Sequence, residues 1–210
     1  MKYTKWTYLY PPRPDFAIAC AMLNYYETRG WLAQYKKNGT NTIIGIAPNK
    51  TFYAMNRHAA NHKAWHLTQH IKEALIELFP EKKWFVLCAE IMHSKTPTIK
   101  DTIYIHDMLV WKSEFLLDST FIERANLLDD RLITNVESHS HYVCDSEGKI
   151  WYAKRFDRGF KTIFNSIKQV RIDEGLVLKD PIGKLRACNT PTENSSWQVK
   201  CRHKTKGYAF

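Results

Sequence analysis

The clearest pattern along this chain is a series of short apolar, β-prone stretches separated by polar and turn residues. Residues 84–91 and 102–110 are strongly apolar and predict the central strands of a sheet. The remaining predicted strands, of which the first three form a meander, are residues 31–35, 42–46, 51–54, 149–154, 176–179 and 198–202.

Helical spacing is strongest in residues 61–79, which predict the best helix of the chain. Pro80 ends the pattern, because proline cannot continue a helix. The apolar positions that recur at helical spacing are Ala64, Leu67, Ile71, Leu75 and Leu78.

A row of histidines accompanies this predicted helix, with His58, His62, His66 and His70 recurring every four residues. Two histidines at this spacing can chelate a metal, and a protonated row can meet phosphates. A solvated helix flank is favoured, because no carboxylate or cysteine at ligand spacing completes a metal site.

A short helix is also predicted after the proline-rich segment at residues 10–14. Asp15 can cap this helix, which would run to about Thr28. Its partly inward side chains would be Phe16, Ala19, Ala21 and Leu23.

Two further helices follow in the second half. Ser119 or Thr120 with Glu123 makes a capping box for a helix through Leu128. Residues 157–167 predict another helix, after a turn at residues 145–148. Strands cluster rather than alternate strictly with helices, which favours an α+β class built on antiparallel sheets, in one domain spanning residues 1–210.

Charge points to a polyanionic partner, since the formal net charge is +10 and the isoelectric point is about 9.3. Basic surfaces also occur on proteins that bind no nucleic acid, so charge alone does not decide. The cysteines are scattered and lack a C-x-x-C pair, which favours a reducing compartment. No apolar run is long enough to span a membrane, so a cytoplasmic protein is expected.

The candidate chemistry centres on Lys36, which is followed two residues later by Asn38-Gly39. A neutral lysine amine can attack a phosphorus and hold the product as a phosphoramidate. Nearby cations and a metal would neutralise the phosphate and lower the pKa of the amine. The Asn38-Gly39 pair predicts a tight turn with positive backbone angles. An isolated K-x-N-G is more often a solvated hairpin lysine.

The order of the later motifs favours a nucleophilic Lys36 over a solvated hairpin lysine. They resemble, in order, those of the adenylation domain of ATP-dependent DNA ligases, within the covalent nucleotidyltransferase superfamily that includes RNA ligases and capping enzymes. The resemblance covers about residues 31–202 and implies an ATP-grasp-like nucleotidyltransferase fold, with antiparallel sheets flanked by helices and a nucleotide cleft between them. The motifs are residues 36–39, 56–57, 85–90, 104–107, 174–180 and 197–202.

This resemblance implies that Lys36 carries AMP from ATP. It also implies that Glu90 contacts the ribose, that Lys179 contacts the α-phosphate, and that Glu174 helps to bind Mg²⁺ or Mn²⁺. Charge neutralisation at phosphorus is what this chemistry needs.

Lys200 and Arg202 alternate along a predicted strand, so both side chains would emerge on one face. The resemblance implies that they bind the phosphates. Arg202 stands where the family usually has lysine, and an arginine can bind phosphate in a bidentate manner.

Three assignments are less determined by the motifs. His106 stands where ligases usually place a phenylalanine that stacks on adenine, with Tyr104 as the alternative stacking residue. Arg57 would face the ribose or the 5′-phosphate of the nick, with a surface arginine as the competing interpretation. Gln34 could read the adenine edge.

The resemblance implies a nick-sealing DNA ligase of compact, virus-like or phage-like form, with DNA repair or replication as its setting. Typical relatives continue into an OB-fold whose basic motif orients pyrophosphate, and the sequence shows no counterpart of that motif. We therefore expect a monomer that binds nicked duplex DNA unaided, or one that needs a partner supplying an OB-fold. An RNA ligase and a non-catalytic nucleic-acid-binding module remain alternatives.

Overall fold

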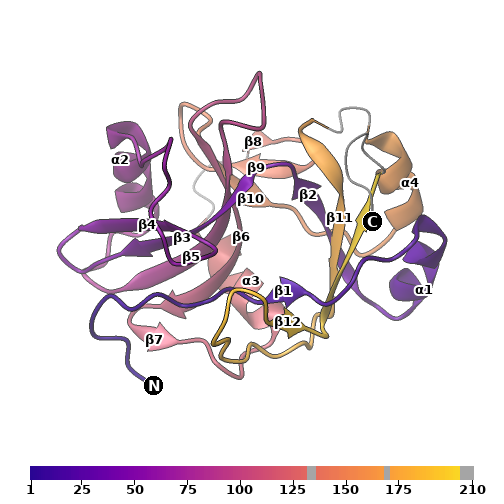
Figure 1. Ribbon diagram of the computed structural model, residues 1–210, viewed down its shortest axis with the longest axis horizontal. Coiled ribbons are helices and arrows are strands. Elements are labelled where there is room, and N and C mark those ends of the chain that lie inside the picture. Colours follow the sequence, from indigo (N-terminus) through magenta and orange to yellow (C-terminus); the bar gives the residue numbers. More distant parts are fainter. Residues whose placement is uncertain (132–135, 168–170, 204–210) are drawn as a thin grey trace.

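The computed structural model describes residues 1–131, 136–167 and 171–203, which form two main β-sheets (Figure 1). The larger sheet has eight strands in the order β4-β3-β5-β6-β10-β9-β8, with β7 paired to β6. The smaller sheet has three strands in the order β13-β11-β2. Neighbouring strands of both sheets are antiparallel as expected, except that β10 runs parallel to β6.

The predicted strands exist with small shifts at their ends, and several short ones are added. The strands of the smaller sheet are β2 (Leu32–Lys37), β11 (Asp173–Lys179) and β13 (Gln198–Arg202). The strands of the larger sheet are β3 (Thr40–Ile46), β4 (Phe52–Asn56), β5 (Phe85–Met92), β6 (Thr102–Trp111), β7 (Glu114–Phe115), β8 (Val136–Glu137), β9 (His141–Val143) and β10 (Ile150–Ala153).

The expected meander of residues 31–54 is wrong, because β2 and β3 belong to different sheets. The predicted tight turn at Asn38-Gly39 is also wrong in its geometry, since neither residue has a positive φ. Instead of folding back on β2, the chain passes here into the larger sheet, where β3 pairs with β4 and β5. This crossing places the end of β2 beside the larger sheet.

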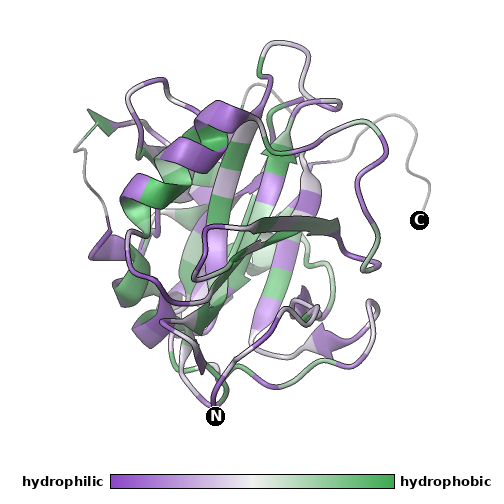
Figure 2. Cartoon of the chain, turned by 90° about the vertical axis from the view of Figure 1, so that its left-hand side faces the viewer, coloured by the Kyte–Doolittle hydropathy of each residue, from purple (hydrophilic) through white to green (hydrophobic). Residues whose placement is uncertain are grey.

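Both faces of the larger sheet are covered, which explains why its central strands are apolar almost throughout. On one face, Ile44 and Leu87 pack in a core that includes α2 (Gln69–Leu78). On the other face, Ile43 and Val86 pack with Tyr3 of the N-terminal segment. Figure 2 shows hydrophobic bands, in green, that recur along the strands, and a helix that carries both hydrophobic and hydrophilic residues.

The predicted helix over residues 61–79 is too long, since only its second half is helical. Thr68 has an extended backbone and accepts a hydrogen bond from the Ile71 amide, so it caps the helix N-terminus. Before this cap, Trp65 and Leu67 are buried in the same core without a helix. The apolar side chains at 65 and 67 therefore follow an irregular backbone.

The predicted histidine row is lost with this half of the helix. His58 follows β4 and is exposed, His62 lies 3.1 Å from Thr42 Oγ1, and His70 Nε2 lies 2.9 Å from Asp145 Oδ2. His62 and His70 contact different partners, and His66 is exposed like His58, so the four side chains do not form the row that their spacing predicts.

The remaining helices cover the smaller sheet and the back of the larger one. The helix expected from Asp15 starts later, as a 3₁₀ turn η1 (Cys20–Met22) followed by α1 (Leu23–Thr28), and Asp15 does not cap it. Of the side chains expected inward, only Leu23 is buried. Before the helix, the backbone amides of Asp15 and Ile18 bond to carbonyls of β13, which holds this segment extended.

The other two helices match the prediction closely. Thr120 and Glu123 form the expected capping box of α3 (Phe121–Asp129). Helix α4 (Phe160–Ser166) begins after Gly159, whose φ is 74°. No helix in residues 1–131, 136–167 and 171–203 is long and apolar enough to cross a membrane.

Candidate nucleotide-binding site

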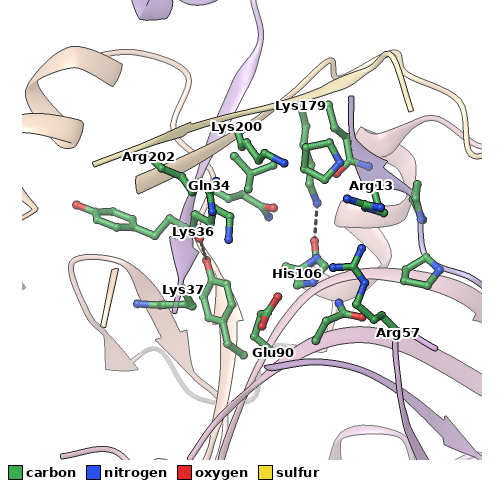
Figure 3. A pocket seen from close by; sticks show the side chains of 18 of the residues that line it. Arg13, Gln34, Lys36, Lys37, Arg57, Glu90, His106, Lys179, Lys200 and Arg202 are labelled. Carbon is green, nitrogen blue, oxygen red and sulfur yellow. Dashed lines mark hydrogen bonds between the residues drawn. The ribbon is translucent and has the colours of Figure 1, made fainter. Parts of the chain in front are cut away.

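A cavity of about 250 Å³ lies between the two sheets, and it brings together most of the predicted site residues (Figure 3). Of those, Glu174 is absent from the cavity wall. The wall consists of Pro11, Pro12, Arg13, Pro14, Gln34, Tyr35, Lys36, Lys37, Asn41, Arg57, Glu90, Tyr104, His106, Val177, Lys179, Pro191, Gln198, Lys200 and Arg202.

The smaller sheet supplies one wall through the alternation of its strands. Its outer face is apolar and packs on α1 and α4, through Ala33, Tyr35, Leu176, Leu178, Val199 and Cys201. The opposite face is mostly polar, and its residues are in register: Gln34 and Lys200 lie on either side of Val177 in one row, and Lys179 pairs with Gln198 in the next. Period-2 alternation therefore gathers side chains from three separate sequence motifs on one surface.

Lys36 lies at the end of this surface and forms an ion pair with Glu174. The pair occurs where β11 bulges, because Asp173 aligns with Lys37 and Gly175 with Lys36, leaving Glu174 as the extra residue. Gly175 has a φ of 153°, and a Cβ there would meet the Cys201 carbonyl oxygen at 2.0 Å. Glycine is thus required for the bulge that brings Glu174 to Lys36.

The neighbouring Lys37 also borders the cavity, but its ammonium is already bound. Its Nζ lies 2.6 Å from Asp173 Oδ1 and 2.9 Å from Ser140 Oγ, and 5.2 Å from the centre of the Tyr104 ring. Burial lowers the pKa of Lys37, and Asp173 opposes that shift. The side chain of Lys37 is almost fully buried whereas that of Lys36 is 22% exposed, which leaves Lys36 as the accessible amine.

Glu90 faces these residues from β5 of the larger sheet, aligned between Asn41 and Tyr104. Burial raises the pKa of Glu90 to about 7, although Lys36 and other cations act in the opposite direction. The carboxyl group therefore changes its charge near neutral pH.

Gly39 explains the glycine of the lysine motif in physical terms. A Cβ at this position would lie 2.9 Å from Glu90 Cβ and 2.9 Å from the Ile91 carbonyl oxygen. The chain that leaves Lys36 must therefore pass directly against β5. Glycine is needed here for close approach, rather than for the turn that its pairing with Asn38 predicts.

His106 reaches the cavity because β6 bulges at this point: Ile105 pairs with Ala89 and Asp107 with Cys88, which leaves His106 between them. Burial, with Lys179 nearby, lowers the pKa of His106 to about 3, so its ring is neutral at pH 7. Tyr104 donates its hydroxyl to the Tyr35 carbonyl and its ring lies against Lys37. The Tyr104 hydroxyl and ring therefore already have partners, whereas the neutral His106 ring borders the cavity.

Lys179 enters the cavity from a buried charge network that sequence analysis did not find. Its Nζ donates to the His106 carbonyl at 3.0 Å and lies 3.7 Å from Asp107 Oδ2. Arg124 makes two hydrogen bonds to the same carboxylate, at 2.9 and 3.1 Å. Burial lowers the pKa of Lys179 to about 8, and Arg124 lowers it further while Asp107 opposes this.

Buried polar atoms without partners identify surfaces that a ligand would satisfy. Gln34 Nε2, Gln198 Nε2 and Asn41 Oδ1 all belong to cavity residues and make no hydrogen bond in the described part of the chain. An unpaired buried polar group is costly, so such atoms mark places where a bound molecule would bond. Neither Gln198 nor Asn41 was predicted, because Asn41 has no motif around it and the motif at residues 197–202 assigns roles only to Lys200 and Arg202.

Positive charge dominates the cavity. Burial lowers the pKa of Lys200, and Arg202, Lys36, Arg13 and Arg57 add to the shift by repulsion. These side chains are therefore close enough to repel one another, as expected where a polyanion binds. Arg13, from the proline-rich N-terminal segment, is a cavity residue that sequence analysis missed, because no motif surrounds it.

A divalent metal fits the carboxylates beside Lys36. No group of three or more His, Cys, Asp or Glu side chains able to hold a metal occurs among the described residues. Glu90 and Glu174 lie close enough to interact electrostatically, and both interact with Lys36. Mg²⁺ is commonly bound by one or two carboxylates together with substrate phosphates, so this pair suits it once a nucleotide supplies the other oxygens.

The two-sheet architecture is the nucleotidyltransferase fold of ATP-dependent DNA ligase adenylation domains, as the motif resemblance predicted. The chain is similar to mycobacterial DNA ligase D in complex with ATP and MES, with 14% sequence identity and a TM-score of 0.63, over 93% of this chain and 60% of that one. It is similar to the ligase domain of M. tuberculosis LigD, with 12% identity and a TM-score of 0.64, over 93% of this chain and 59% of that one.

A third similar structure is the ATP-dependent DNA ligase of bacteriophage T7 in complex with ATP, with 14% identity, a TM-score of 0.54, and coverage of 89% of this chain and 68% of that one. No family model and no curated protein matches the sequence. The chain spans about 60% of the length of the ligase D structures. At these identities, the likeness establishes the fold.

Proposed function

We propose that this chain is an ATP-dependent polynucleotide ligase that seals nicks in DNA through a lysyl-AMP intermediate on Lys36. The observation that carries this proposal is the position of Lys36, an accessible amine on the wall of a cavity that also holds Lys179, Lys200 and the carboxyl group of Glu90. The structural neighbours described as DNA ligases, two of them with ATP bound, support the same reaction class.

In the first step, the Lys36 ammonium gives one proton to Glu174, and the resulting amine attacks the α-phosphorus of ATP and releases its second proton to solvent. A P–N bond forms, the bond to the bridging oxygen breaks, and pyrophosphate leaves with that electron pair. The Glu174 carboxylate, paired with Lys36 Nζ, holds the amine in place and is positioned to receive its proton.

The other residues position the nucleotide. We assign the base to the space between the His106 ring and Val177, with Gln34 Nε2 donating to the base edge. Glu90 accepts hydrogen bonds from the ribose hydroxyls. Lys179 and Lys200 neutralise the charge that develops on the α-phosphate oxygens.

Mg²⁺ or Mn²⁺, held by Glu174 and Glu90 with the phosphates, would supply further charge neutralisation at the reacting phosphorus. In the later steps AMP passes from Lys36 to a 5′-phosphate, and a 3′-hydroxyl then displaces AMP to join the strands. We propose a monomer acting on nicked duplex DNA. Contacts with the DNA backbone would use the same excess of basic residues that gives the chain its net charge of +10.

The test begins with purified protein, Mg²⁺ and ATP labelled on the α-phosphate, beside Lys36→Ala. Label that survives denaturation in the wild type and disappears in Lys36→Ala is the expected result. Lys37→Ala is an informative comparison, because the neighbouring amine is already bound to Asp173. Transfer of the label to Lys37 would remove Lys36 from its assigned role.

The substrate is then tested with nicked duplexes of DNA and of RNA. Sealing of the DNA nick is expected, and sealing of RNA alone would replace the DNA assignment by an RNA ligase. If the wild type neither takes up label nor seals a nick that is already adenylylated, the protein is not a ligase. Adding an OB-fold protein in trans shows whether the first step needs a partner.

A further inference from the structure

Two arginines on the side of the cavity away from Lys36 share one backbone carbonyl and have no acidic partner in the described part of the chain. Arg13 Nη1 donates to the Pro191 carbonyl oxygen at 3.4 Å, and Arg57 Nη2 donates to the same oxygen at 3.3 Å. No carboxylate in the described residues lies within 4.0 Å of the nitrogens of either guanidinium. The two positively charged guanidiniums therefore share one neutral acceptor, the Pro191 carbonyl oxygen.

Both arginines lie on or beside backbone that β-pairing fixes. Arg13 lies in β1 (Arg13–Pro14), which pairs in parallel with β12 (Asn194–Ser195). The neighbouring prolines restrict the backbone of this segment and so limit the entropy lost on binding. Arg57 directly follows β4. Two guanidiniums this close together can bind one phosphate chain, because each arginine can donate two hydrogen bonds to phosphate oxygens.

The surrounding charges also indicate an anion. Burial lowers the pKa of Arg13, and repulsion by Arg57 lowers it further. Burial lowers the pKa of Lys200, and repulsion by both arginines and by Lys36 adds to this shift, so these groups lie close to it. Figure 3 shows Lys36 on one side, Arg13 and Arg57 on the other, and Lys200 above the space between them.

We propose that Arg13 and Arg57 form the binding site for the β- and γ-phosphates of ATP, the group that leaves as pyrophosphate. This inference rests on the proposed function, because it uses Lys36 as the attacking group. In phosphoryl transfer the attacking and leaving atoms lie roughly in line, so the leaving group must be opposite the amine. The phosphate chain then runs from Lys36 past Lys200 to the arginine pair.

This site would give the chain a pyrophosphate-orienting element of its own within the two-sheet fold. The Pro191 carbonyl oxygen would be replaced by phosphate oxygens as each guanidinium turns toward the ligand. Both arginines would stabilise the negative charge that grows on the leaving group when its bond to the α-phosphorus breaks. No new covalent step is required.

Binding of inorganic pyrophosphate, measured by titration calorimetry, tests the site without any need for catalysis. Wild type, Arg13→Gln and Arg57→Gln would be compared, with AMP as a second ligand. We expect each variant to bind pyrophosphate at least about tenfold more weakly, as for loss of a charge-assisted hydrogen bond, and AMP about as well as the wild type. Arg158→Gln, which removes an exposed arginine on another surface, is the matched control.

Unchanged pyrophosphate binding in Arg13→Gln and Arg57→Gln would overturn the proposal. An equal loss of AMP and pyrophosphate would overturn it too, since that pattern indicates a general loss of charge. Thermal melting of each variant excludes misfolding as the cause. The Arg13→Lys variant keeps the charge but loses the planar guanidinium that can donate two hydrogen bonds. Its affinity for pyrophosphate should fall between those of the wild type and Arg13→Gln.

Ligase assays separate this proposal from the proposed function. We expect Arg13→Gln to slow labelling by ATP but to seal an adenylylated nick at the wild-type rate. A normal labelling rate with defective sealing would assign the pair to a nucleic-acid phosphate instead. Arginine-dependent pyrophosphate binding in a protein that neither takes up label nor seals an adenylylated nick would refute the ligase function and leave the polyphosphate site standing.

Discussion

The Lys36 ammonium and the Glu174 carboxylate pair at the point where β11 bulges against β2. The bulge depends on Gly175, whose position cannot accept a side chain without displacing β13. A strand irregularity, rather than a loop, therefore sets the position of the proposed nucleophile. The geometry of this pair is thus fixed by the backbone of the smaller sheet.

Glu174→Gln should slow adenylylation without unfolding the protein. The amide keeps the size of the carboxyl group but loses the charge that holds Lys36 and the carboxylate proposed to bind the metal. We expect the rate of label uptake to fall by about 10²-fold or more, a typical effect of removing an electrostatic group from an active site. We also expect more Mg²⁺ to be needed for half-maximal rate. Glu137→Gln, on exposed β8, should match the wild type in both measurements.

Glu90 should make both activity and stability depend on pH near neutrality. Its pKa in the folded protein is about 7, above its ordinary value of 4.5. The folded state therefore keeps a proton between pH 4.5 and 7 that the unfolded chain releases, and stability falls as pH rises through this window. Above pH 7 the free-energy cost of burying the ionised Glu90 carboxylate no longer changes with pH. Glu90→Gln should be more stable there than wild type by about 1–3 kcal/mol.

Urea unfolding at pH 5 and pH 8 measures this difference, with Glu77→Gln on the exposed face of α2 as the control. Label uptake should rise with pH through about 7 in the wild type, because the ionised carboxylate is the form that accepts ribose hydrogen bonds and binds a metal. A stability difference that is the same at both pH values would show that Glu90 does not titrate in this range.

Asp107→Asn should be one of the most destabilising single changes in the chain. Burial alone would raise the pKa of Asp107, but Arg124 and Lys179 outweigh it and hold that pKa well below its usual range. Removing the carboxylate leaves two buried cations without a counter-ion, at a cost of about 3–5 kcal/mol. In the wild type, the ionised Asp107 carboxylate stabilises the fold at pH values above the ordinary pKa of an aspartate. This stabilisation is lost as the pH falls toward the lowered pKa of Asp107 in the folded protein.

The same change should lower the pKa of Lys179 below its present value of about 8, since Asp107 is the group that keeps this lysine charged. Chemical unfolding measures the first effect, and the pH profile of label uptake measures the second. Asp118→Asn, which breaks an exposed pair with Arg186, should cost about 0–1 kcal/mol. Equal stability of the two variants would contradict a structural role for the buried network.

The longer strands of both sheets could be predicted from the sequence, because short apolar runs bounded by turn residues leave few other choices. The short strands β7, β8 and β9 were missed. The sequence pattern does not reveal which sheet each strand joins. β2 and β3 are consecutive and only two residues apart, yet they lie in different sheets. The helix over residues 61–68 was wrongly predicted because Ala64 and Leu67 continue the helical spacing of Ile71, although Ala64 is exposed and Leu67 is buried from a non-helical backbone.

Site residues that belong to sequence motifs could be predicted, whereas site residues without a motif could not. Lys36, Glu90 and Lys179 belong to ordered motifs, and the fold brings them to one cavity or its edge. Arg13 and Asn41 have no sequence pattern around them, and only tertiary structure places them there. Arg124 was recognisable only as part of a helix, although it supports Lys179 through Asp107.

Gly39→Ala should impair catalysis through the position of Glu90 rather than through the backbone of a turn. A methyl group at 39 would lie 2.9 Å from both Glu90 Cβ and the Ile91 carbonyl oxygen, so β5 and the end of β2 must move apart. Because Lys36 and Glu90 sit on these two elements, the shift separates the proposed nucleophile from the ribose contact. We expect about a 10²-fold loss in the rate of label uptake, as for an ångström-scale misplacement of reacting groups.

Gly30→Ala is the comparison that separates a steric collision from backbone strain as the cause of lost activity in Gly39→Ala. Gly30 has a φ of 72°, and a Cβ at this position would meet no described atom within 4 Å, so alanine there adds backbone strain without a collision. We expect Gly30→Ala to lose stability and keep its labelling rate, and Gly39→Ala to lose the labelling rate even under conditions where it is fully folded. If Gly39→Ala is labelled as fast as wild type, close packing of this glycine against β5 does not position the site.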